Sequence, residues 1–331
     1  MALDVKVKIE VSKAVGSVGF GIPLLLESGA TKAVSYTVCY SLDDVVSAGF
    51  AAETGMYKAA SAVFAQEHRP EKIAVCAVTG DATAELPALV AKDWRQLVLV
   101  GGETDDYIGV ADYIETTNNK MLFVSMSATE WATFKGGLTA KKYKRTVIFV
   151  NGTANAAAAL VGETAGRTAG SFTYKFKTLK GVDAETYTEA ELAAMHTAGA
   201  FAYVTKAGDD VTTEGISQSG TYIDLTDSID YVIQNIEYRV QKTMNNAAKI
   251  SYDDKGIAIL EAAVTSALQE AAVNGIIATL EDGSYDYTVS FGGRSATTEA
   301  DRASRVYKYG TFRFSLAGAI HDCEVFGTVT N

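Results

Sequence analysis

One segment pairs an apolar run with glycines in a way that could bind a ligand. Leu97–Val100 passes directly into Gly101-Gly102, and backbone N–H groups in such a turn can hold a phosphate where a helix begins. The segment matches neither G-x-G-x-x-G nor a P-loop, and the acidic Glu103, Asp105 and Asp106 that follow would repel a phosphate. We expect a capped turn between a strand and a helix. A soluble α/β enzyme that binds a nucleotide or another ligand at this turn is kept as the alternative function.

Three aspartates form a second candidate site. Asp224, Asp227 and Asp230 recur every three residues, which places three carboxylates on one side of a helix and could hold a cation. They also stand at the start of that helix, where negative charge complements the helix dipole, or where they could pair with an arginine of a partner. We favour these explanations over a metal site.

The familiar catalytic patterns are missing from the sequence. The histidines His68, His196 and His321 have no cysteine, histidine or carboxylate at metal-ligand spacing, and HExxH, GxSxG and Walker A motifs are absent. We expect each histidine to lie on the surface or to be hydrogen-bonded in the core. The sequence predicts no catalytic residue, no cofactor and no bound metal, and therefore a protein that is not an enzyme.

Composition narrows the remaining classes of function. The 331 residues include 29 Lys and Arg against 40 Asp and Glu, so the net charge is −11, which argues against a nucleic-acid partner. Three widely spaced cysteines without a CxxC motif favour reduced thiols in the cytosol. The longest apolar runs fall far short of the roughly 20 residues that cross a bilayer, and the first residues do not read as a signal peptide. We expect no direct membrane insertion.

Strand and helix patterns alternate from about residue 30 to 205. The runs predicted as strands are 33–39, 73–78, 97–100, 121–125, 146–150 and 200–204. The stretches predicted as helices are 42–64, 86–93, 105–118, 129–134 and 154–168. Such alternation is typical of βαβ units and a mainly parallel sheet that is covered on both faces.

The pattern changes after residue 210. Asp224–Asn246 and Gly256–Val273 repeat apolar residues at helical spacing, and 276–280, 285–291 and 306–329 read as strands. The predicted fold class is α/β (α+β overall), with a mainly parallel outer domain and a smaller α+β assembly domain. The predicted boundaries are 1–28 for an N-terminal strand arm and linker, 29–208 for the outer domain, 209–305 for the inner assembly domain, and 306–331 for a C-terminal strand arm that packs with the inner domain.

Both ends of the chain alternate apolar and polar residues without an obvious partner strand. An unpaired terminal strand leaves backbone groups unsatisfied, so we predict that both arms pair with neighbouring subunits. The arm residues are Val5, Val7, Ile9 and Val11 at one end and Phe312, Phe314, Leu316, Ile320 and Val325 at the other. The predicted hinge of the N-terminal arm consists of Gly16, Gly19 and Gly21.

The C-terminal half resembles the tail sheath proteins of contractile phage tails and of R-type bacteriocins such as diffocins. The resemblance rests on about a third of the chain: the two helices and the closing strand. Its motifs are the helix start Tyr222-Ile-Asp-Leu-Thr-Asp-Ser-Ile-Asp, the turn Lys249–Ile257, the helix end Asn274-Gly275-Ile276-Ile277 and the closing stretch Leu316–Val329.

The resemblance implies a structural subunit that stacks in helical rows of rings around an inner tail tube. Contraction of such a sheath drives the tube through a target cell envelope. The implied partners are further copies of the chain, the inner tail tube protein, and baseplate and tail terminator proteins. The implied location is the tail of a phage or bacteriocin particle that is assembled in the host cytoplasm. A tail tube or capsid subunit is a third hypothesis, against which the long helices count.

A short basic stretch at the end of the long helix is the candidate tube-facing surface. It consists of Arg239, Lys242 and Lys249 in an otherwise acidic chain. The alternative explanation is that these cations complement the negative end of the helix dipole.

Overall fold

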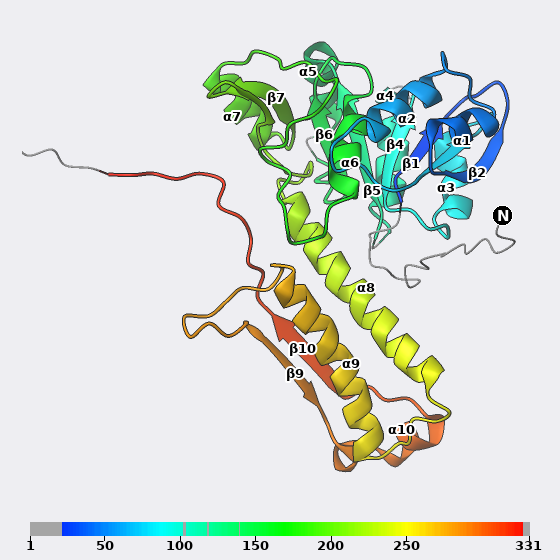
Figure 1. The fold of residues 1–331 in the computed structure, drawn as a ribbon, viewed down its shortest axis with the longest axis vertical. Coiled ribbons are helices and arrows are strands. Elements are labelled where there is room, and N and C mark those ends of the chain that lie inside the picture. Colours follow the sequence, from blue (N-terminus) through cyan, green and yellow to red (C-terminus); the bar gives the residue numbers. More distant parts are fainter. Residues whose placement is uncertain (1–21, 102–103, 118, 139, 327–331) are drawn as a thin grey trace, which may run out of the picture.

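The computed structural model describes residues 22–101, 104–117, 119–138 and 140–326. These residues form an outer α/β domain and a smaller inner unit, and the long helix α8 (Ile223–Asn246) runs from one to the other (Figure 1). The predicted combination of a mainly parallel sheet with a small α+β unit is confirmed. The predicted N-terminal arm residues Val5 to Val11 and the hinge glycines lie outside the described residues.

The outer domain is built on one eight-stranded sheet of order β2-β3-β1-β4-β5-β6-β7-β8. The inner six pair in parallel, whereas β2 and β8 are antiparallel to their neighbours at the two edges. The strands are β1 (Leu24–Glu27), β2 (Val34–Cys39), β3 (Ile73–Ala77), β4 (Gln96–Val100), β5 (Met121–Met126), β6 (Thr146–Val150), β7 (Phe201–Lys206) and β8 (Asp209–Thr212).

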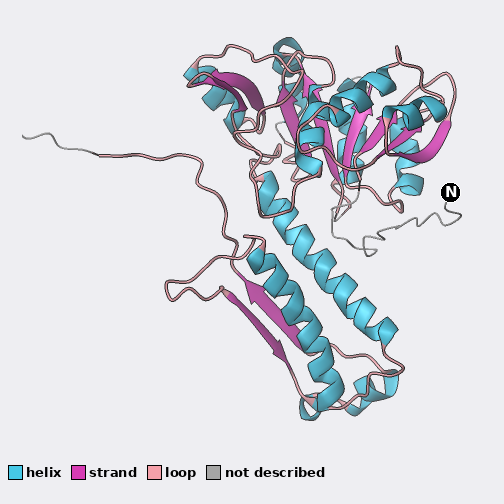
Figure 2. Ribbon diagram, viewed as in Figure 1, coloured by secondary structure: helices cyan, strands magenta, loops and turns pink. Residues whose placement is uncertain are grey.

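Helices cover both faces of this sheet (Figure 2). One face packs against α1 (Leu42–Ser47), α2 (Gly55–Phe64) and α6 (Ala156–Ala165). The other packs against α3 (Ala82–Leu89), α4 (Thr104–Ile114), α5 (Ala128–Leu138) and α7 (Glu189–Thr197). Strands buried on both faces read as continuous apolar runs, which is why the longer ones could be located from the sequence.

The predicted helix over 42–64 is two helices. Ser41 caps α1 in a capping box with Asp44, and Thr54 caps α2 by accepting a hydrogen bond from the Tyr57 N–H at 3.2 Å. Between them Gly49 adopts φ +113°, a backbone conformation that an α-helix does not use. The chain therefore turns where periodicity alone indicates continuation.

The outer domain extends beyond both predicted boundaries. Leu24–Glu27, assigned above to an arm and linker, is β1 and lies between β3 and β4 in the sheet. Asp209–Thr212, assigned to the inner domain, is β8 and pairs with β7. Both strands have only four residues, too few to show a reliable periodicity.

The inner unit packs two helices against a two-stranded sheet. Its elements are α8, α9 (Asp254–Val273), β9 (Tyr287–Phe291), the 3₁₀ turn η1 (Arg294–Ala296), α10 (Glu299–Ser304) and β10 (Gly310–Phe314). Val232 of α8 and Leu268 of α9 are fully buried in its core. Both long helices match their predicted positions within two residues, whereas no helix was predicted at the position of α10.

Within the described ranges, α9 alone is long and apolar enough to cross a membrane by length and composition. Its buried side, including Val264, Leu268 and Ala271, forms part of the inner core. Core helices of proteins that do not enter membranes meet the same criterion.

Candidate functional site

The two-stranded sheet of the inner unit is open along both edges. β9 and β10 run antiparallel, with Val289 opposite Phe312. Gly292 N–H donates to the Tyr309 carbonyl and Ser315 N–H to the Asp286 carbonyl, so the even-numbered residues of β9 face β10. It follows that Val289 and Phe291 turn their backbone groups away from β10.

The same alternation applies to the opposite edge. Phe312 and Phe314 of β10 direct their backbone N–H and C=O groups away from β9. In the part of the chain that the structure describes, no hydrogen bond reaches the outward backbone groups of these two phenylalanines, of Val289 or of Phe291. An unpaired strand edge of this kind is a template for another strand.

One face of this sheet is anchored and the other is exposed to solvent. Tyr287, Val289 and Phe314 pack against the core formed with α9, whereas Thr288 and Arg313 are exposed on the opposite face. Two strands alone are marginally stable in water, and α9 supplies the packing that this pair requires. The inner unit thus holds a fixed sheet to which strands can be added at either edge.

The structure corrects the predicted extent of the C-terminal arm. Phe312 and Phe314 pair with β9 of the same chain, and Leu316 bridges to Ile277, so these three residues are not a free strand. Local alternation showed that they form a strand but could not show that the preceding strand is their partner. Ile320 and Val325 are each 87% exposed and remain candidates for pairing with another subunit.

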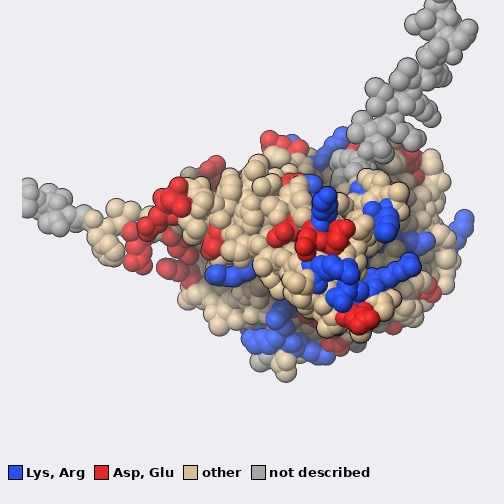
Figure 3. All heavy atoms as spheres, turned by 90° about the horizontal axis from the view of Figure 1, so that it is seen from below, with Lys and Arg blue, Asp and Glu red and all other residues tan. Residues whose placement is uncertain are grey.

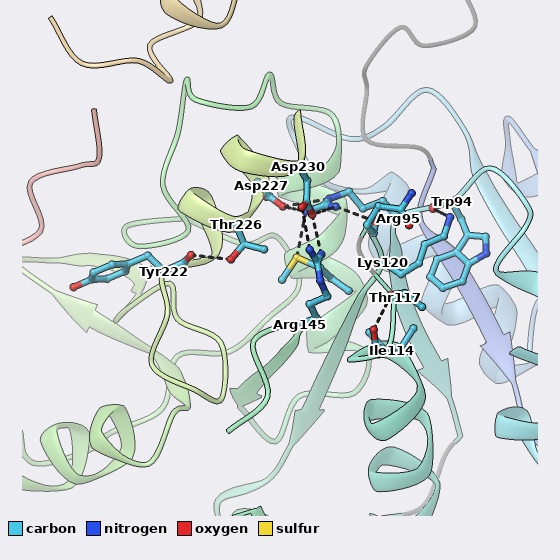
Figure 4. A network of polar contacts seen from close by, with 12 residues as sticks. Trp94, Arg95, Ile114, Thr117, Lys120, Arg145, Tyr222, Thr226, Asp227 and Asp230 are labelled. Atoms are coloured by element: carbon cyan, nitrogen blue, oxygen red, sulfur yellow. Dashed lines mark hydrogen bonds and ion pairs between the residues drawn. The ribbon is translucent and has the colours of Figure 1, made fainter. Parts of the chain in front are cut away.

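A buried ionic network holds the start of α8 against the outer domain (Figure 4). Arg95, just before β4, donates through Nη1 to Asp230 Oδ2 at 2.7 Å and pairs through Nη2 with Asp227. Arg145, just before β6, contacts both Asp230 carboxylate oxygens at 2.8 and 3.0 Å. The Tyr174 hydroxyl donates to Asp227 at 2.9 Å. We call these five residues the α8 joint.

Burial and charge act in opposite directions on the joint. Burial works to lower the pKa of Arg95, but Asp227 and Asp230 outweigh it and raise that pKa. Beside the joint, burial lowers the pKa of Lys120 to about 8, and the Lys120 ammonium lies over the Trp94 ring at 4.5 Å from its centroid. The two aspartates therefore keep Arg95 charged in the interior.

The joint explains the aspartate cluster seen in the sequence. Asp227 and Asp230 form ion pairs, as expected, but with arginines of their own chain and not of a partner. Asp224 lies apart from these arginines in a cavity, where burial raises its pKa. Among the described residues no group of three His, Cys, Asp or Glu is placed to hold a metal ion.

The turn at Gly101, the candidate ligand site, is poorly suited to binding an anion. Gly101 has φ +70° and lies beside a hollow of about 220 Å³ at the carboxyl ends of β4, β5 and β6; Gly102 is outside the described residues. Glu130 also lines this hollow, and its carboxylate accepts hydrogen bonds from the Ser127 N–H and hydroxyl, both at 2.7 Å. The turn is therefore flanked by a capping box with an acidic side chain.

The three histidines have hydrogen-bonded neighbours, as expected. His68 contacts Glu163 at 2.8 Å, His196 contacts Thr213 at 3.0 Å, and His321 contacts Glu214 at 2.7 Å. Sequence spacing could not identify these pairs, because the partners of His68 and His321 are 95 and 107 residues away.

The predicted tube-facing cations differ in their surroundings. Arg239 is tied to its own chain: it pairs with Glu270 and donates to Asn235 at 2.8 Å and to Ser266 at 3.1 Å. Lys242 and Lys249 are exposed. Figure 3, which views the molecule from the end that carries α10, shows basic side chains gathered over this end among fewer acidic ones.

Comparison with known proteins shows which solved structures share this architecture. No family model and no curated protein matches the sequence. The solved structures that match include the contracted helical sheath of the anti-feeding prophage, with a TM-score of 0.69 and 13% identity over 94% of this chain and 93% of that one. A contracted sheath complex of the extracellular contractile injection system PVC gives 0.71 and 12% over 93% and 91%. A sheath tail protein from Listeria innocua gives 0.60 and 9% over 82% and 89%.

The chain therefore has the fold of contractile tail sheath proteins, over nearly its whole length. At this level of identity the likeness establishes the fold, and the expected fold class is confirmed.

Proposed function

We propose that this chain is the structural subunit of a contractile tail sheath, which polymerises around an inner tube and contracts to drive it through a target cell envelope. The proposal is supported by one observation above all: a sheath fold whose inner sheet is open at both edges. Strand addition supplies main-chain hydrogen bonds, while alternate side chains choose the register. Contacts between different surfaces of identical subunits propagate without closing, so they form a tube.

The donated strands come from the two ends of the chain. We propose residues 5–11, which alternate charged and apolar residues, as the N-terminal donor strand, and the glycines at 16, 19 and 21 as its hinge. The C-terminal donor lies beyond Leu316, because the residues before it are paired within the subunit. Two open edges and two arms give each subunit two donor and two acceptor positions.

The energy for contraction is stored at assembly as subunit packing, and no nucleotide is hydrolysed. Each subunit moves largely as a rigid unit, while the arms stay paired and act as links. The enzyme alternative receives no support from the Gly101 turn, because the acidic Glu130 lines the same hollow as Gly101. The proposed location is the tail of a phage or bacteriocin particle, assembled in the host cytoplasm.

The end of the inner unit that carries α10 is the proposed contact with the inner tube. We call it the inner tip and define it as residues 242–255 and 294–308. Its two segments are joined: Arg294 N–H donates to Asp254 at 2.7 Å, and the Tyr252 hydroxyl donates to the Val306 carbonyl at 2.9 Å. It holds seven basic and four acidic residues in a chain with a net charge of −11. An acidic tube surface would complement it.

The proposed strand addition can be tested with proline at an outward position. Val289→Pro removes one outward N–H while leaving the hydrogen bonds between β9 and β10 in place. We expect the wild-type chain at high concentration to form striated or cogwheel-shaped tubes in negative stain, and Val289→Pro to remain a folded monomer. Val289→Ala is the matched control, because it shortens the same side chain but keeps the N–H.

Removal of residues 1–12 tests the other half of the exchange. The shortened chain should stay folded and monomeric by size-exclusion chromatography and circular dichroism. Tubes of normal appearance from both the truncated chain and Val289→Pro would refute strand exchange. A wild-type chain that stays monomeric at every concentration would refute the sheath function itself.

A further inference from the structure

The C-terminal segment leaves the inner unit over a cavity. Ala317 N–H donates to the Ile276 carbonyl at 2.9 Å, which is the last backbone hydrogen bond of the inner unit to this segment among the described residues. Gly318 then adopts φ +65°, with open space where a Cβ would lie. A cavity of about 400 Å³ lies beside Leu316, Gly318 and Ala319. This stretch crosses from the inner unit toward the outer domain.

The ring of His321 packs into a pocket of the outer domain and the start of α8. We call this pocket the seat of His321 and define it as Thr173, Phe176, Glu214 and Tyr222. Its Nδ1 lies 2.7 Å from Glu214 Oε1 and its Nε2 lies 2.8 Å from Thr173 Oγ1. The Tyr222 ring meets it edge-on, with centroids 4.8 Å apart, and the Phe176 ring lies 6.3 Å away. The side chain of His321 is only 7% exposed. Both ring nitrogens are therefore engaged.

A second polar contact adjoins the seat. The Lys175 ammonium, itself nearly buried, lies 3.2 Å from Glu214 and 3.4 Å from Asp322. The charged and titratable groups around His321 are thus Glu214, Lys175, Asp322, Tyr222 and, across the cavity, Asp224. The seat belongs entirely to the outer domain and to the start of α8.

Exposure changes abruptly on either side of the seat. Ile320, immediately before His321, is 87% exposed, and Phe326, five residues after it, is 89% exposed. Within 317–326, His321 is the one residue whose side chain is nearly buried in contacts with the outer domain. Figure 1 shows the segment running away from the body beyond this region.

We propose that His321 is an anchor that fixes where the C-terminal arm leaves the subunit, so that the segment offered to a second copy of the chain begins at Cys323. This inference rests on the proposed sheath function and refines its donor strand. Without the anchor, the arm pivots at Gly318 and spreads over many directions. With the anchor, fewer conformations are lost when the arm pairs, which strengthens association without any new intersubunit contact.

The variant His321→Ala tests the anchor in the full-length chain. A hydrogen bond to a charged group contributes enough that its loss should raise the critical concentration for tube formation on the order of tenfold. His321→Gln keeps an amide that can reach one of the two partners and should recover part of the loss. His68→Ala is the control, because it removes another histidine paired with a glutamate, and no contact between His68 and residues 317–326 is seen.

A second readout needs no polymer. Backbone ¹⁵N order parameters of residues 319–323 should fall in the His321→Ala monomer, while those of β9 and β10 should not change. An unchanged critical concentration, or unchanged order parameters at 319–323, overturns the anchor. If the wild-type chain never polymerises, the sheath function fails instead, and the order parameters alone decide whether His321 holds the arm.

Discussion

The α8 joint makes Arg95 the most informative position for a stability measurement. The side chains of Arg95 and Asp227 are 2% and 7% exposed, so neither is screened by water. In Arg95→Met, Asp230 keeps both contacts with Arg145, but Asp227 keeps only the Tyr174 hydroxyl. One carboxylate is therefore left buried without a cation.

Leaving one partner of a buried ion pair uncompensated costs about 3–5 kcal/mol. Because Asp227 retains a hydrogen bond, we expect Arg95→Met to lower the free energy of unfolding by about 3 kcal/mol, near the lower end of this range. This corresponds to a fall in Tm of roughly 6–12 °C for a domain of this size. Urea unfolding followed by circular dichroism measures the change directly.

Two further variants separate charge from packing. Arg95→Met with Asp227→Asn removes the unpaired charge and should recover about 1–2 kcal/mol of the loss, because the buried carboxylate causes most of the penalty. Lys141→Met breaks an exposed pair, Lys141 Nζ to Asp112 Oδ1 at 2.8 Å, and should cost less than about 1 kcal/mol. If Arg95→Met costs no more than Lys141→Met, the joint does not hold α8 to the outer domain.

Two other predictions concern the cavity and the inner tip. Burial raises the pKa of Asp224, so its contribution to stability is full below the unfolded pKa and is lost as the pH rises through the folded value. Asp224→Asn should therefore raise Tm at pH 7, with a gain that shrinks toward pH 4; a loss of Tm at pH 7 would contradict this. The double reversal Lys242→Glu and Lys249→Glu should abolish co-purification with the inner tube protein without preventing sheath polymerisation, whereas Lys58→Glu on the outer domain should affect neither. Equal loss of both properties would argue against tube contact at the inner tip.

The sequence was most informative where local pattern and burial coincide. Apolar runs such as Thr146–Val150 are buried on both faces of the sheet, and α8 and α9 carry long amphipathic repeats, so their positions could be predicted. The four-residue β1 was missed, although Leu24–Leu26 is fully buried, because a run this short resembles any apolar linker.

The candidate site depended on contacts that no local pattern encodes. Asp227 and Asp230 were recognised as a cluster, but their partner Arg95 lies 132 and 135 residues earlier in the chain. Phe312 and Phe314 were recognised as strand residues, but pairing with β9 depends on how the chain turns through α10. The seat of His321 combines three separate segments, and the spacing of histidines and acids gave no indication of it.

The length of α8 has a mechanical consequence. From Asp230 in the α8 joint to Asn246 at the end of α8 is 16 residues, or about 24 Å at 1.5 Å per residue. A tilt of roughly 12° at the joint would displace the far end by about 5 Å, which is close to the spacing between adjacent strands in a sheet. In the proposed sheath, strand exchange would therefore tolerate little change in the angle of α8 at Arg95, and the stiffness of a few buried ion pairs would set how accurately each ring lines up with the next.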